Sequence, residues 1–293
     1  MSLPVKVLHG KADGPTMWLS AAIHGDEING VEVIRRLMDL LDPRDLRGTV
    51  IAVPIVNVFG FMNGSRYLPD RRDLNRSFPG SPRGSLASRL ADLFLTQIVD
   101  RCGFGIDFHT GAHHRTNLSQ IRADLQDAPT RGVAEAFGAP IMIHAKLRDG
   151  SLRETAASRG AKVLLFEGGE PNRFSRQVIE TGVDGTMRVL RYLDMWGDGP
   201  AKVDTQPMVS EKTLWVRARR SGILWLQVQI GDHVRKGQPL GTISDAFGEG
   251  AAHLTAPSDG VVIGTTRNPL TSQGDGLVHI ALLDQQGSTP ESS

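Results

Sequence analysis

The chain has 293 residues, of which 40% are hydrophobic and 22% charged, and its formal net charge is +1. This length suits one large globular domain with a smaller one, and the balanced charge gives no basic surface for nucleic acid or an anionic membrane. No apolar run approaches the ~20 residues that span a bilayer, the single Cys102 cannot form an intrachain disulfide, and the first residues lack a signal-peptide pattern. We therefore expect a cytoplasmic protein without nucleic-acid or membrane partners.

The first two thirds of the chain alternate short apolar runs with longer amphipathic segments. Strands are predicted at 17–23, 49–56, 105–109, 141–145 and 161–169. Helices are predicted at 31–41, 85–100, 130–137, 151–158 and 173–195, the second opened by a serine cap. This alternation predicts an α/β sandwich around a largely parallel sheet. In such sheets functional residues lie on the loops beyond the strand ends, which is where His24, His109 and Glu167 fall.

The composition changes after a segment at 197–207 that is rich in Gly, Pro and charge and reads as a linker. Short strand-like runs separated by GD and DG turns then predict an all-β module. Two of its segments, GILWLQVQIGDHVRKGQPLGTI and APSDGVVIGTTRNPLTSQGDGLV, look like versions of one half-repeat. The module resembles the barrel-sandwich fold of biotinyl and lipoyl carrier domains. The turn region at 251–258 has no lysine to modify, so we expect a structural module that roofs or dimerises the protein.

The first candidate site combines motifs at two strand ends. AAIHGDEING places His24 and Glu27 directly after a predicted strand, and DFHTG places His109 at the end of another. Two histidines and one glutamate form a nitrogen and oxygen set that suits Zn²⁺ and leaves a fourth position open, as in catalytic sites. An HxxE pair alone is a weak signal, because a histidine at a strand end is usually only hydrogen-bonded. His113 and His114 are rival ligands, but their adjacency makes them poor joint ligands.

Two carboxylates flank these motifs. Asp107 lies two residues before His109 on the same strand, where it is either an acceptor for a ligand imidazole or a locally held charge. In LLFEGGE, Glu167 ends a strongly apolar strand, and a carboxylate there is costly unless it is paired or functional. We predict Glu167 as the general base and Glu170 as a surface residue.

The loop GSRYLPDRRDLNRSFPG supplies four arginines, and the arginine fork suits carboxylate recognition and oxyanion stabilisation. Arg71 and Arg72 read as solvated charges, whereas Asn75 and Arg76 lie in the motif DLNRSFPG. Three further cations, Lys146, Arg148 and Arg153, read as surface charges.

The motifs HGDE, DLNRSFPG, DFHTG and FEGG, in this order and spacing, resemble the succinylglutamate desuccinylase/aspartoacylase family, which is related to the zinc carboxypeptidases. The resemblance implies that His24, Glu27 and His109 bind one zinc ion and that Glu167 is the catalytic glutamate. It also implies that Asn75 and Arg76 grip the substrate carboxylate. An upstream arginine polarises the scissile carbonyl in this family. Arg66 is our choice for that role, with Arg71 and Arg72 as alternatives.

The resemblance further implies a zinc-carboxypeptidase-like α/β/α sandwich with a mixed central sheet, followed by a small all-β barrel-sandwich domain. We expect a hydrolase domain at 1–198, the β-rich domain at 199–286 and a disordered tail at 287–293. The implied activity is hydrolysis of a small N-acyl amino acid of the N-acetyl or N-succinyl type. The FPG ending and the carrier-like domain resemble bacterial deacylases of N-acetylated amino acids and diamines.

Two other functions remain open from the sequence. The same metal site would serve a carboxypeptidase acting on peptides, which needs a wider pocket. A non-catalytic binding protein could also keep the fold, although the ligands and the base are all present. We expect a homo-oligomer, with the β-rich domain as a contact surface.

Overall fold

The computed structural model describes residues 2–146, 148–197, 199 and 206–283. It divides into two compact units, Met1–Pro207 and Met208–Ser293. The predicted domain break falls at residue 198, outside the described residues, as does the predicted tail at 287–293. Among the helices of the described ranges, none has both the length and the apolar character that a membrane crossing requires.

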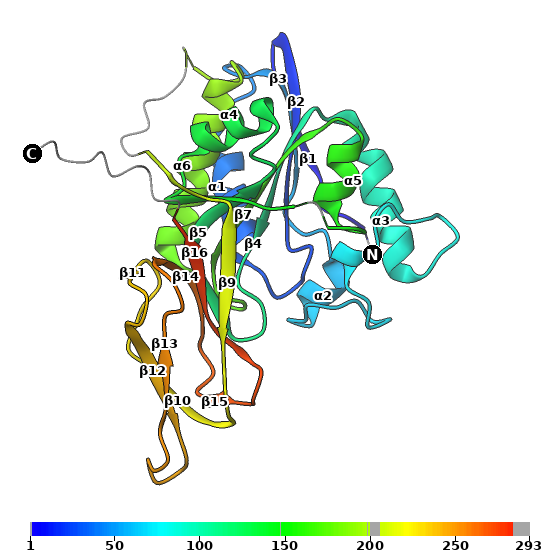
Figure 1. The fold of residues 1–293 in the computed structure, drawn as a ribbon. Coiled ribbons are helices and arrows are strands. Elements are labelled where there is room, and N and C mark those ends of the chain that lie inside the picture. Colours follow the sequence, from blue (N-terminus) through cyan, green and yellow to red (C-terminus); the bar gives the residue numbers. More distant parts are fainter. Residues whose placement is uncertain (1, 147, 198, 200–205, 284–293) are drawn as a thin grey trace, which may run out of the picture. The chain divides into compact units, whose positions relative to one another are not determined.

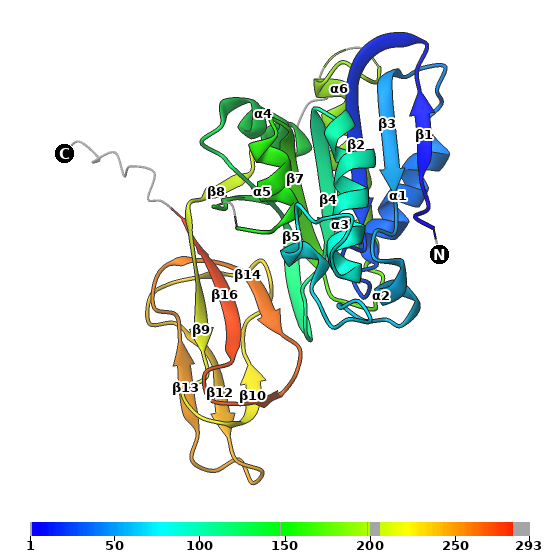
Figure 2. The ribbon, with the colours of Figure 1, turned by 90° about the vertical axis from the view of Figure 1, so that its right-hand side faces the viewer.

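The first unit is built on a mixed sheet with strand order β1-β3-β2-β4-β7-β5 (Figure 2). Strand β6 pairs with β5. Its strands are β1 Lys6–His9, β2 Ala12–Ala21, β3 Arg47–Val53, β4 Phe104–His109, β5 Arg115–Ala123, β6 Ile141–His144 and β7 Lys162–Gly169. The central strands β3, β2, β4 and β7 are parallel. Strand β1 runs antiparallel to β3 and β5 antiparallel to β7, whereas β6 is parallel to β5. The prediction of an α/β fold with a mixed central sheet is confirmed, and the centre of the sheet is parallel.

Helices cover both faces of this sheet (Figures 1 and 2). They are α1 Asn29–Leu40, α2 Val58–Met62, α3 Leu86–Gln97, α4 Ala128–Phe137, α5 Leu152–Ser158 and α6 Arg176–Tyr192, with 3₁₀ turns η1 Leu74–Arg76 and η2 Val99–Arg101. On one face, α1 packs against α6 and lies so close to the sheet that a Cβ on Gly30 would meet the Phe108 side chain of β4 at 2.2 Å. On the other face, α3 and α5 share a buried cluster with the sheet residues Trp18 and Val163. The predicted serine cap is present, since the Ser85 side chain accepts from the backbone N–H of Ser88.

Strand β5 is the main element that the sequence pattern does not indicate. It lies antiparallel beside β7, with Gln120 opposite Glu167. Its sequence, RTNLSQIRA, contains too many polar residues for a buried strand by composition. The short strand β1 and helix α2 are also absent from the predicted elements.

The second unit consists of two sheets, as Figure 1 shows. Its strands are β8 Met208–Ser210, β9 Lys212–Arg217, β10 Gly222–Leu226, β11 His233–Val234, β12 Pro239–Ser244, β13 Ala252–Thr255, β14 Gly260–Thr266, β15 Leu270–Thr271 and β16 Gly276–Leu282. One sheet contains β9, β16, β14 and β11, the other β13, β12, β10 and β15. Residues of both sheets, including Leu224, Ile243, Val262 and Ile280, form one core.

The predicted half-repeat is visible in the strand pairing of this unit. In the first half, the short strand β11 lies between the longer strands β10 and β12 in the sequence. In the second half, the short strand β15 lies in the same way between β14 and β16. Each short strand crosses to the other half, because β11 pairs with β14 and β15 pairs with β10. The two halves therefore interlock, and one hydrophobic core serves both.

Candidate active site

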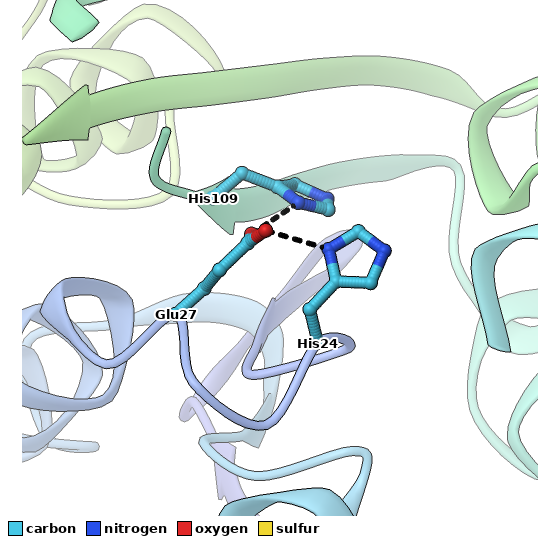
Figure 3. Close-up of side chains that lie close together, drawn as sticks. All are labelled: His24, Glu27 and His109. Atoms are coloured by element: carbon cyan, nitrogen blue, oxygen red, sulfur yellow. Dashed lines mark hydrogen bonds and ion pairs between the residues drawn. The ribbon is translucent and has the colours of Figure 1, made fainter. Parts of the chain in front are cut away.

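Three side chains converge at the ends of two parallel strands. His24 and Glu27 lie on the loop after β2, and His109 ends β4, the parallel neighbour of β2. The Glu27 carboxylate contacts both imidazoles, with His24 Nδ1 2.8 Å from Oε1 and His109 Nδ1 2.8 Å from Oε2 (Figure 3). All three residues are at least 96% buried. The parallel strands thus bring together residues that are far apart in the sequence.

The donor set of this cluster fits a zinc ion. One potential ligand atom from each residue lies within 4.8 Å of the others. Among the described residues, these three form the group of His, Cys, Asp or Glu side chains that is close enough to hold a metal ion. Ligand atoms at ~2.1 Å from a tetrahedral zinc are about 3.4 Å apart, so the observed spacing needs only small side-chain adjustments. Two imidazole nitrogens and one carboxylate leave a fourth position for water or substrate.

Two aspartates hold the far side of the imidazole rings. His109 Nε2 lies 2.8 Å from Asp107 Oδ2, and the Ser20 hydroxyl donates to Asp107 Oδ1 at 2.7 Å. His24 Nε2 lies 3.1 Å from Asp73 Oδ1. Such contacts fix ring orientation and direct both Nδ1 atoms toward the cluster. The contact of Asp107 with the imidazole, one of its two predicted interpretations, is present, whereas Asp73 was missed. Its position at the start of DLNRSFPG was the available signal.

The electrostatics of the cluster follow from its burial. Burial by itself would raise the pKa of Glu27, but the charges of His24 and His109 and their hydrogen bonds outweigh it and hold that pKa far below its usual value. Burial would lower the pKa of His109, yet the charges of Asp107 and Glu27 raise it well above its usual value. The pocket therefore keeps an ionised carboxylate and favours a cation beside it.

Arg66 is the arginine that the fold places at this cluster. Its Nη1 donates to Glu27 Oε1 at 3.0 Å and its Nη2 to Asp73 Oδ2 at 3.0 Å. Arg72 lies in the exposed part of the loop, where its nearest acid is Asp70 at 3.9 Å, and Arg71 is also exposed. Of the three arginines considered from the sequence, Arg66 is the one with contacts to this cluster.

Asn75 and Arg76 form η1 beside the cluster, on a turn that Asp73 caps through the backbone N–H of Asn75 at 2.8 Å. Asn75 is buried, and its Oδ1 accepts from the backbone N–H of Leu152 at 2.9 Å. Arg76 is exposed overall, but its guanidinium is partly covered, and this partial burial together with the charge of Arg148 lowers the pKa of Arg76. This part of the site presents an amide donor and a guanidinium.

Glu167 stands next to His109 by strand register, because the two residues are partners in the parallel β4–β7 pair. Side chains at paired positions point to the same face of a sheet, so Glu167 faces the side that carries the cluster. The Asn117 amide donates to Glu167 Oε2, and Arg122 Nε lies 3.7 Å from Oε1. Neither of these β5 residues is among the predicted site residues, because the polar sequence of β5 gives no strand signal.

Of the remaining candidates, Arg153 requires a correction. The sequence predicts a surface charge at this position, but Arg153 is 92% buried and donates to the carbonyl oxygens of Ala145 and Lys146 at 2.8 Å each. Burial lowers the pKa of Arg153 to about 10. The backbone carbonyls replace the water that this guanidinium would otherwise require.

The remaining residues considered from the sequence lie on loops, as expected. His113 and His114 are exposed with positive φ, and the ring of Tyr67 lies 6.3 Å from that of His113. Glu170 is 3.3 Å from Arg173. Lys146 and Arg148 are exposed, as expected.

The chain is similar to known proteins in sequence and in fold. The family model of the succinylglutamate desuccinylase/aspartoacylase catalytic domain matches residues 13–193. The chain is 30% identical to an N-alpha-acetyl-L-2,4-diaminobutyric acid deacetylase of Halomonas elongata, over 95% of this chain and 85% of that protein.

Two solved structures are also similar. A succinylglutamate desuccinylase/aspartoacylase from Rhodobacter sphaeroides has 28% identity and a TM-score of 0.86, covering 96% of this chain and 89% of the other. The product-bound ectoine utilization protein EutE (DoeB) from Ruegeria pomeroyi has 25% identity and a TM-score of 0.87, with the same coverage. The match to the catalytic-domain model spans more than half of the chain, so this protein belongs to the succinylglutamate desuccinylase/aspartoacylase family.

Proposed function

We propose that this chain is a zinc-dependent deacylase that hydrolyses the amide bond of a small N-acyl amino acid. The observation that carries the proposal is the buried cluster of His24, Glu27 and His109. The name of the Halomonas elongata relative favours an N-acetyl group over N-succinyl. The products would be a carboxylate and a free amine.

His24, Glu27 and His109 would hold one zinc ion per chain. When bound there, zinc supplies Lewis-acid chemistry, which makes water a stronger nucleophile at neutral pH and polarises a carbonyl. Asp107 and Asp73 orient the two imidazoles for this task.

Glu167 acts as the general base in this proposal. Its carboxylate takes one proton from the attacking water and later gives that proton to the leaving nitrogen, so the residue ends the cycle unchanged. Arg66 brings a fixed guanidinium to the edge of the cluster, where it stabilises negative charge on the carbonyl oxygen.

Asn75 and Arg76 bind the substrate carboxylate. Because Asn75 Oδ1 accepts from Leu152 N, its amide nitrogen remains as the donor toward a substrate oxygen. Arg76 adds the charge and the forked geometry that a carboxylate prefers.

The architecture and setting of the enzyme complete the proposal. The first unit has helices on both faces of a mixed sheet, as a zinc-carboxypeptidase-like sandwich would. The interlocked strands of the second unit suit a barrel-sandwich module. We further propose domain limits of 1–198 and 199–286, a cytoplasmic location and a homo-oligomer.

The experiment that tests this mechanism is the substitution Glu167→Gln, with Glu170→Gln as the matched control. General acid–base catalysis contributes roughly 10²- to 10⁴-fold, so Glu167→Gln should lose activity by that factor and keep about one zinc per chain. Glu170→Gln should leave both unchanged. Activity of Glu167→Gln near that of the unmodified enzyme would show that Glu167 is not the base.

A further inference from the structure

We propose that Asn117 is a positioning residue for Glu167, holding one carboxylate oxygen so that the other faces the reacting water. The inference rests on the proposed function, since it takes Glu167 as the base. The observation behind it is the contact between the Asn117 amide and the Glu167 carboxylate, which no predicted motif contains.

The two oxygens of Glu167 have different surroundings. Asn117 Nδ2 donates to Oε2, and an amide nitrogen can only donate. Oε1 has Arg122 Nε at 3.7 Å, beyond hydrogen-bond distance, and this Nε is a buried nitrogen without a hydrogen-bond partner in the described part of the chain. The contact with Asn117 therefore fixes the rotamer of Glu167 and leaves Oε1 to take the proton.

The backbone of β5 is shaped to make this contact. Gln120 pairs with Glu167, but Asn117 pairs with Gly169, so the register slips by one residue between Asn117 and Gln120. Such a bulge re-aims the side chains beside it and commonly lies next to active sites. Asn117 is 92% buried at this bulge, and a buried amide keeps its place only when it is hydrogen-bonded.

The charged groups around Glu167 come from three elements. Strand β4 contributes His109, the register partner of Glu167, and Asp107, which pairs with Leu165. Strand β5 contributes Arg122, and α5 contributes Arg153, whose charge interacts with those of Arg122 and Glu167. Asn117, in contrast to these charged groups, is a neutral donor, so it can fix the Glu167 carboxylate without adding a charge.

The near-isosteric substitution Asn117→Asp replaces the donor with an acceptor and places a second carboxylate against Glu167. We expect kcat to fall about 10- to 100-fold, while KM stays within about threefold and the zinc content stays near one per chain. The acidic limb of the pH–rate profile should move to higher pH, because the added negative charge disfavours ionised Glu167. A purely structural role of Asn117 would lower stability without moving that limb.

Asn268→Asp is the matched control. Asn268 is exposed in the second unit, and its Oδ1 accepts from Leu270 N, a role that aspartate keeps. This variant should match the unmodified enzyme in kcat, KM and pH profile.

A second pair of variants keeps the test decisive if Asn117→Asp does not fold. Asn117→Ser and Asn117→Ala are both smaller than asparagine, and only serine retains a donor. We expect the serine variant to have the higher kcat at equal zinc content. Equal kcat for the two, or an unchanged kcat and pH profile in Asn117→Asp, would overturn the inference.

Glu167→Gln, measured in parallel, separates this inference from the proposed function. If Glu167→Gln is inactive while Asn117→Asp is unimpaired, only the positioning role fails. If Glu167→Gln stays active, the assignment of the base fails, and the role of Asn117 fails with it.

Discussion

The two sides of the candidate site differ in how their charges are compensated. On the metal side, Glu27 is 99% buried and touches two imidazoles and Arg66, so each charge faces an opposite or polar partner. On the proposed substrate side, Arg76 and Arg148 are exposed, and within the described ranges neither forms an ion pair with a carboxylate. The charges of the proposed metal side are thus compensated within the protein, whereas the proposed substrate side has positive charge that an anionic substrate would balance.

The largest expected effect comes from breaking the metal side. His109→Ala removes one of three ligands, and we expect zinc to be lost and deacylation to fall on the order of 10³-fold or more. His233→Ala is the matched control, because His233 is an exposed histidine of the second unit. Metal analysis and turnover on N-acetyl amino acids measure both effects. Full activity of His109→Ala without metal would contradict the ligand assignment.

A smaller loss is expected from changing Asp107, which contacts the proposed ligand His109. Asp107→Asn keeps the size of the side chain but weakens its hold on His109 Nε2, which should reduce zinc affinity roughly 10- to 100-fold. Competition with a chelator of known affinity measures this change. Asp39→Asn, at an exposed residue of α1, should have no effect. Unchanged zinc affinity in Asp107→Asn would show that this contact does not support the ligand.

The substrate side is tested by Arg76→Ala. Hydrogen bonds to charged groups contribute about 1.5–3 kcal/mol, so kcat/KM should fall roughly 10- to 150-fold, mainly through KM, with zinc retained. Arg72→Ala, in the exposed part of the same loop, should change neither value. The loss should disappear for an N-acyl amine that lacks the carboxylate. An equal loss for both substrates would show that Arg76 does not bind this group.

The smallest expected effect on catalysis comes from Arg153→Met. Arg153 donates to the carbonyl oxygens of Ala145 and Lys146, at the start of the loop that carries Arg148. Leaving these acceptors without a donor should cost about 1–3 kcal/mol of unfolding free energy, while KM rises about threefold and the zinc content is unchanged. Denaturant unfolding and steady-state kinetics measure this change. Unaltered stability would contradict the structural role of Arg153.

The central strands of the first unit and the residues at their ends could be predicted from the sequence. The strands β2, β4 and β7 can be predicted from their apolar runs, because a strand between two helix layers is buried on both faces. The loop after β2 carries His24 and Glu27, and the neighbouring strand β4 ends at His109, so the topology alone brings them together.

The rest depends on pairing that no local pattern specifies. The polar residues of β5 give no strand signal, and the roles of Asn117 and Arg122 appear only once that strand lies beside β7. Arg153 looks like a surface charge because the carbonyls that solvate it come from the preceding loop. Asp73 was overlooked for a similar reason, since it meets His24 through the fold of a loop far along the chain.

The most direct test of the account is metal content measured together with deacylase activity, before and after chelation. The substrate panel would contain N-acetyl and N-succinyl amino acids, including N-acetylated 2,4-diaminobutyrate, together with short peptides. We predict about one zinc per chain, and hydrolysis of an N-acyl amino acid that is lost on chelation and restored by zinc. Cleavage of the peptides alone would indicate a carboxypeptidase. A chain that binds no metal and turns over no member of the panel would contradict the account and indicate a binding protein.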